Sequence, residues 1–177
     1  YSDPLLFNNI FWDNRAGTRV GSTVGGIGAS GDATPIDNWD LGVADETGLL
    51  SPTNSIVQQD AGVHPYTTSA TNATSDPAVV DPYVTELTFA PWRTNPAFLG
   101  AILVGADLPP KLLGDYHLAG TDSPAFNLGA PDKAVPSYQQ PPSTLAAPTT
   151  DIDGQARPAR GGFDAGADEI PPPLADL

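Results

Sequence analysis

The sequence contains no cysteine and no methionine, and only seven of its 177 residues are lysine or arginine. Without cysteine, the chain can form neither disulfides nor thiolate metal sites. Its 21 aspartate and glutamate residues leave a formal net charge of −14. This charge disfavours nucleic acids and anionic membranes as partners, because like charges repel. No apolar run reaches about 18 residues, so the sequence predicts no membrane-spanning helix.

Glycine and proline are abundant, with 18 and 20 residues respectively. Proline inside a helix costs roughly 3 kcal/mol, and proline is excluded from the central strands of a sheet. Turns must therefore separate many short elements. The length suits a single domain with one core, and we expect an all-β domain.

Short apolar runs bounded by turn residues predict a series of strands. These runs lie at residues 5–12, 38–43, 54–59, 78–80 and 85–89, with a weaker one at 19–24. At residues 95–104, a helix with Asn95 as N-cap and Pro96 at its first position competes with a short buried strand. Residues 135–150 are rich in proline and are expected to run extended over the surface.

Three motifs occur in a characteristic order along the chain. They are LLFNNIFWDN at residues 5–14, GDYHLAGTDSPAFNLGA at residues 114–130 and DIDGQARPARGGFDAGADE at residues 151–169. Together they resemble the last rungs and the closing segment of a right-handed parallel β-helix. The resemblance is to bacterial surface proteins with a choice-of-anchor Q domain, in the pectate-lyase-like superfamily. TSDPAVVDP at residues 74–82 adds to it.

The resemblance implies the C-terminal rungs of such a β-helix plus an irregular closing segment, with long loops and at most one short helix. Residues 1–170 then form a single domain, followed by a tail at 171–177. Within the domain, rung strands and loops occupy 1–60, a loop-rich insert 61–113 and the closing segment 114–170.

Asn8 and Asn9 fit this fold as structural residues. In a β-helix each rung forms hydrogen bonds to the rungs above and below it. Asparagines at rung corners can stack on one another, and asparagine tolerates the left-handed backbone conformation of a turn. We therefore interpret both residues as rung corners and not as catalytic groups.

The motif DIDG at residues 151–154 contains the first half of a calcium-binding loop. Asp151, Asp153 and Asp164 are the candidate calcium ligands, and Asp168 or Glu169 could supply further oxygens. The remaining ligands are missing at loop spacing. The sequence therefore predicts no cofactor, with calcium at this motif as the alternative.

A structural interpretation of the same segment competes with calcium binding and is favoured by the sequence. Asp151 and Asp153 then form Asx turns, and Arg157 pairs with Asp164 or Glu169. Such a polar segment would close the end of the solenoid, where a further apolar rung would leave an exposed edge.

An enzymatic function is the alternative, because many β-helix proteins cleave acidic polysaccharides. A lyase needs a carboxylate cluster that binds a cation, and a basic residue that accepts a proton. Arg15, Arg19 and Arg93 could supply the base. However, the Gly-His-Gly and Arg-Ile-Lys patterns of pectate lyases and polygalacturonases are absent.

A hydrolase pair or a sugar-binding platform could form from Asp37, Asp40 and Asp45 around Trp39. Such clusters on an acidic protein are usually solvated loops, which is the plainer interpretation. His64 and His117 are too far apart in sequence for a recognisable histidine site. His117 is expected to face solvent or cap a turn, and the tryptophans are expected in the core.

The sequence favours a non-enzymatic structural, adhesive or scaffold element, located outside the cell or at its surface. We expect it to be part of a longer polypeptide or a subunit of an assembly. The backbone N–H and C=O groups on the outer edge of the first strand then need a further strand to pair with. Upstream rungs, a second protein or another copy of the chain could supply it. Carbohydrate is the further candidate partner, bound or cleaved in a groove that lies mostly upstream.

Overall fold

The computed structural model describes residues 2–20, 23–83, 87–89, 102–104, 114–136 and 142–173. Within these ranges all regular secondary structure is short strand, and the expected all-β class is confirmed. The strands form five two-stranded sheets. They are β1 (Ile10–Phe11), β2 (Thr18–Val20), β3 (Thr23–Gly25), β4 (Ile56–Val57), β5 (Val79–Asp81), β6 (Leu87–Phe89), β7 (Ile102–Val104), β8 (Asp115–Leu118), β9 (Asp132–Val135) and β10 (Ser143–Ala146). In the described part of the chain, no helix is long and apolar enough to cross a membrane.

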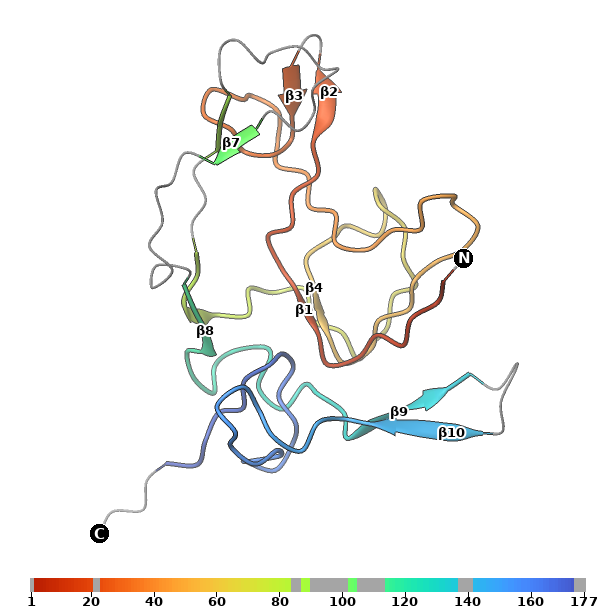
Figure 1. The fold of residues 1–177 in the computed structure, drawn as a ribbon, viewed down its shortest axis with the longest axis vertical. Helices are drawn as coiled ribbons and strands as arrows, with labels where there is room; N and C mark the ends of the chain where they lie inside the picture. Colours follow the sequence, from red (N-terminus) through yellow and green to blue (C-terminus); the bar gives the residue numbers. More distant parts are fainter. Residues whose placement is uncertain are drawn as a thin grey trace.

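One sheet is parallel and lies near the middle of the molecule (Figure 1). Ile10 of β1 pairs with Ile56 of β4, and Ile56 also forms a parallel bridge with Ala73 on its other side. Residues 6–11, residues 53–58 and Ala73 therefore lie in one parallel arrangement, which we call the three-segment stack. Parallel neighbours need long connections, and here aligned residues are 46 and 17 positions apart in sequence.

The stack has an apolar core on each of its two faces. Side chains alternate between the faces of a strand, so Ile56 and Val57 point into different cores, and both are fully buried. The first core contains Ile56, Leu118, Ala125, Ala165 and Ile170, with Ile10 and Trp12 packed against it. The second contains Leu41, Val57 and Tyr66, with Phe11 packed against it.

The other four sheets are antiparallel pairs: β2 with β3, β5 with β8, β6 with β7, and β9 with β10. The single strand expected at residues 19–24 is instead spread over the two arms of the β2–β3 hairpin. Residues expected to be extended at 135–150 include β10, which pairs with β9 and projects from the body (Figure 1).

The elements expected at residues 38–43 and 95–104 differ from the structure or lie partly outside the described residues. The strand expected at residues 38–43 does not form, because the N–H groups of Asp40 and Leu41 donate to the Gln59 side chain and not to a neighbouring strand. Of the region 95–104, only Ile102–Val104 is described, and it is strand β7. Residues 95–101 lie outside the described residues, as do Trp92 and Arg93.

The closing segment expected at residues 114–170 is not irregular throughout, because it includes the strands β8, β9 and β10. Its remainder, residues 147–170, contains isolated bridges but no regular strand, and we use the name closing segment for this remainder below. It lies beside β8 at the end of the molecule that carries the C-terminus (Figure 1). Gly166 joins this segment to the stack, because its N–H donates to the carbonyl of Asn8 at 2.9 Å. A Cβ on Gly166 would come within 2.8 Å of the Ile10 side chain, and its φ of 101° favours glycine. Of the expected tail, residues 171–173 are exposed.

Candidate functional site

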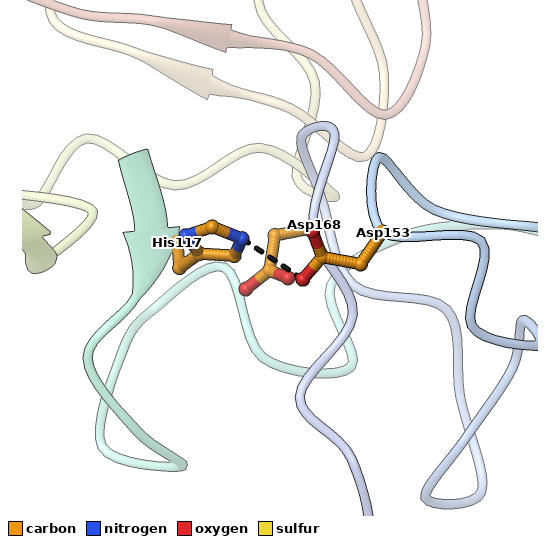
Figure 2. A group of neighbouring side chains, drawn as sticks. All are labelled: His117, Asp153 and Asp168. Carbon is orange, nitrogen blue, oxygen red and sulfur yellow. Dashed lines mark hydrogen bonds and ion pairs between the residues drawn. The ribbon is translucent and has the colours of Figure 1, made fainter. Parts of the chain in front are cut away.

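Strand β8 holds a histidine with both ring nitrogens engaged. Asp115 and His117 are two residues apart, so their side chains lie on the same face of the strand. Asp115 Oδ1 lies 2.5 Å from His117 Nδ1 and also accepts the backbone N–H of His117. On the other side of the ring, His117 Nε2 lies 3.0 Å from Asp153 Oδ2 (Figure 2).

A third carboxylate, from Asp168 of the closing segment, lies beside His117 and Asp153 (Figure 2). Asp168 is only 6% exposed, and its Oδ2 accepts the backbone N–H of Leu118 at 2.8 Å. One ligand atom each of His117, Asp153 and Asp168 can be chosen so that all three lie within 4.8 Å of one another. We call these three residues the His-Asp-Asp cluster.

Hydrogen bonding with Asp115 raises the pKa of His117. Partial burial opposes this rise, whereas the negative charges of Asp168, Asp115 and Asp153 add to it. The same hydrogen bonds lower the pKa of Asp115. The arrangement therefore stabilises positive charge at the imidazole, in the form of a proton or of a cation bound at Nε2.

The calcium candidates have different surroundings from one another. Asp151 forms the expected Asx turn, with Oδ1 accepting the N–H groups of Asp153 and Gln155. Asp164 is buried, and its two oxygens accept backbone N–H groups while burial raises its pKa. Of the three candidates, only Asp153 is part of the His-Asp-Asp cluster.

Sequence reasoning did not group His117 with Asp153 and Asp168. His117 and Asp153 are 36 positions apart, so no local motif connects them. The available signal was the alternation Asp115-Tyr116-His117, which places a carboxylate beside an imidazole in any strand.

A buried ion pair holds the closing segment together. Arg157 Nε lies 2.9 Å from Glu169 Oε2, and the two side chains are 4% and 1% exposed. Glu169 also accepts the N–H groups of Ala159 and Asp164, and the Arg157 guanidinium donates to the carbonyl of Asp164. The pairing expected for Arg157 is therefore made with Glu169.

Polar side chains form a ladder along the three-segment stack. The N–H of Asn9 donates to Ser55 Oγ at 3.1 Å, and the N–H of Ser55 donates to Asn72 Oδ1 at 3.2 Å. Asn9, Ser55 and Asn72 occupy equivalent positions in the register. The N–H groups of Asn9 and Ser55 are thus each bonded by the side chain of the aligned residue in the next segment. We call these three residues the polar ladder.

The preceding positions repeat a second device. Asn8 and Asn54 both adopt the left-handed conformation, with φ of 57° and 49°. Their side-chain amides donate to the carbonyls of Ala130 and Leu128, respectively. Of the two asparagines interpreted as rung corners, Asn8 adopts the left-handed conformation and Asn9 does not. The bonds of Asn8 and Asn54 tie the corners of two segments to the segment that precedes β9.

The acidic residues around Trp39 form internal contacts. Trp39 is half exposed and stacks on His64, with ring centroids 4.2 Å apart. Asp37 lies 2.7 Å from His64 Nε2, and both oxygens of Asp40 accept hydrogen bonds. Asp45 closes an Asx turn. These three carboxylates therefore hold a histidine ring, backbone and side-chain N–H groups, and a turn in place.

The three comparisons, with protein-family models, with curated proteins and with solved structures, found no match for this chain.

Proposed function

We propose that the chain is the end portion of a right-handed parallel β-helix. In this proposal it acts as a structural, adhesive or scaffold element outside the cell or at its surface. The observation that carries the proposal is the polar ladder, because the side chains of Ser55 and Asn72 repeat one role along a parallel stack, each accepting the N–H of the aligned residue in the segment before it. Repetition of this kind is typical of solenoids, in which each unit bonds to its neighbours.

The first segment of the stack has an unused edge. Hydrogen bonds alternate along a parallel strand, and Asn9 and Phe11 face β4, so the N–H and C=O of Ile10 point away from it. No residue in the described ranges forms a hydrogen bond with these two groups or with Asn9 Oδ1. The ladder thus presents both a backbone edge and a side-chain acceptor.

An unused strand edge templates the addition of another strand. In the ladder, Ser55 Oγ accepts the N–H of Asn9, and Asn9 Oδ1 would play the same role for a strand added before it. We propose that upstream rungs of the same polypeptide, a second protein or another copy of the chain supply this strand.

Polysaccharide binding is the rival function, and it would require an exposed aromatic ring and free carboxylates. The side chain of Trp39 is about half exposed and so meets the first requirement in part. Its neighbours Asp37, Asp40 and Asp45 already accept hydrogen bonds within the chain. No described contact therefore favours this function over the scaffold.

A matched pair of proline variants tests the proposed edge. Ile10→Pro removes an N–H that points outward together with a side chain that packs on the first core, so we expect association to be lost and the stability to fall no further than in Ile10→Ala, which removes the packing alone. Phe11→Pro removes an N–H that points at β4, so we expect loss of stability. Thermal unfolding reports on the fold, and sedimentation at several concentrations reports on association.

Hydrogen exchange adds a readout at single residues. In the assembled protein the amides of Ile10 and Phe11 should both be protected, whereas dilution to monomer should expose Ile10 alone. An 18.3 kDa monomer in which Ile10 is as protected as Phe11 would mean that the edge is satisfied within the chain, and would refute the proposal.

A further inference from the structure

We propose that the His-Asp-Asp cluster binds one divalent transition-metal ion such as zinc. Nε2 of His117 faces Asp153 at 3.0 Å, and both carboxylates point toward the ring (Figure 2). Two ligands at 2.0–2.1 Å from a tetrahedral ion lie about 3.3 Å apart. The pair His117–Asp153 has nearly this separation, and the limit of 4.8 Å for the whole group leaves only a side-chain adjustment.

The environment of Asp168 is an independent reason to place a cation here. Its side chain is among the buried charged groups of the protein, at 6% exposure. Within the described ranges it accepts one hydrogen bond, from the N–H of Leu118, and it has no ion-pair partner. A buried charge is costly unless it is paired or coordinates a metal. A cation at His117 Nε2 would supply the missing counter-charge.

Asp115 acts as a positioning residue for this site. Its bond to Nδ1 selects the imidazole tautomer that carries the proton on Nδ1, and this leaves the lone pair of Nε2 directed at Asp153. A carboxylate behind a metal-binding histidine is a common arrangement, in which it fixes the ring and increases its basicity.

The donor set selects the class of ion. One imidazole nitrogen and two carboxylate oxygens suit zinc and neighbouring first-row metals. Calcium requires six to eight oxygen ligands, which this group does not supply. Three protein ligands leave at least one coordination position for water or for a donor from another molecule.

The ion would connect three separate parts of the chain. His117 belongs to β8, whereas Asp153, in the turn after Asp151, and Asp168 belong to two separate stretches of the closing segment. Metal binding would therefore fasten the closing segment to β8. Because the ion binds only the folded state, it raises the melting temperature.

The test uses the full chain, treated with chelator and then titrated with zinc chloride. The protein has only two histidines, so each gives a separate ring signal in NMR spectra. We expect saturable binding of one ion, with shifts at the ring of His117 and not of His64. Zinc at about a hundred times its Kd should raise the melting temperature by about 5–10 °C.

Three variants separate the site from general binding to an acidic surface. His117→Gln and Asp153→Asn should abolish the one-ion binding and the thermal shift, and the exposed position of Asp153 favours a folded variant. His64→Gln should retain both. Weak binding of several ions that survives His117→Gln would overturn the proposal. A His117 ring that titrates with pH but does not respond to zinc would overturn it also, as would stabilisation by calcium alone.

Discussion

At the scale of single residues, this fold depends on charged side chains in unusual positions. Arg157, Asp164, Asp168 and Glu169 are all buried, in a segment without regular secondary structure. Their hydrogen bonds run mainly to backbone N–H and C=O groups, which a helix or sheet would otherwise have satisfied. The charges therefore replace secondary structure as the frame of the closing segment.

The buried ion pair of Arg157 should contribute far more to the free energy of unfolding than the contact of the exposed Arg160. Arg157→Ala leaves Glu169 charged, 1% exposed and without its partner, so we expect a loss of about 3–5 kcal/mol in the free energy of unfolding. Arg160→Ala is the control, because Arg160 is exposed and lies over the ring of Phe126, a contact worth about 0.5–1 kcal/mol. Urea unfolding measures both. Equal losses would show that the buried pair is not special.

At the scale of elements, the described strands are short and pair into two-stranded sheets. A lone two-stranded pair is marginal in water, and all four residues of β10 are exposed, so this strand buries little surface. The parallel pair differs, because β4 lies between β1 and Ala73 and has a core on each face. The β4 strand is therefore the centre of the fold.

Shortening a buried side chain of β4 should strongly lower the stability of the protein. Ile56 is fully buried in the first core, so Ile56→Ala should lower the free energy of unfolding by about 2–5 kcal/mol. Ile152→Ala removes the same atoms from a side chain that is 57% exposed, and should change it by less than about 1 kcal/mol. Chemical denaturation compares the two. A small effect at Ile56 would mean that the stack is not the main source of stability.

At the scale of the whole molecule, the net charge of −14 dominates. Like charges on a folded chain repel one another, and salt screens them over a Debye length that falls from about 30 Å at 0.01 M to about 8 Å at 0.15 M. Added ions are therefore expected to increase the stability and the self-association of a chain of this charge.

Added salt should raise the melting temperature over this range. The measurement is thermal unfolding in sodium chloride and in potassium chloride, which should agree if screening is the cause. Sucrose at matched osmolality is the control for general exclusion effects. A fall in melting temperature would show that attractive pairs such as Arg157–Glu169 outweigh the net repulsion.

Local patterns predicted the parts of the fold that depend on neighbouring residues. The run at 54–59 contains β4, and the run at 5–12 contains β1, because a short apolar run between turn residues has few alternatives to a strand. The strand expected at 38–43 failed because a distant side chain, that of Gln59, took the N–H groups that a partner strand would have bonded. The pairing of strands was also beyond local reasoning.

The sequence alone determined the all-β class, the acidic net charge and the absence of thiol chemistry. These follow from composition and from the backbone preferences of single residues. Only the tertiary structure decided that His117, Asp153 and Asp168 meet, and that Asn9, Ser55 and Asn72 form one ladder. The physical reason is that both groupings depend on which long connections bring distant segments together. That choice is made by burial of the two cores over the whole chain, which no short stretch of sequence encodes.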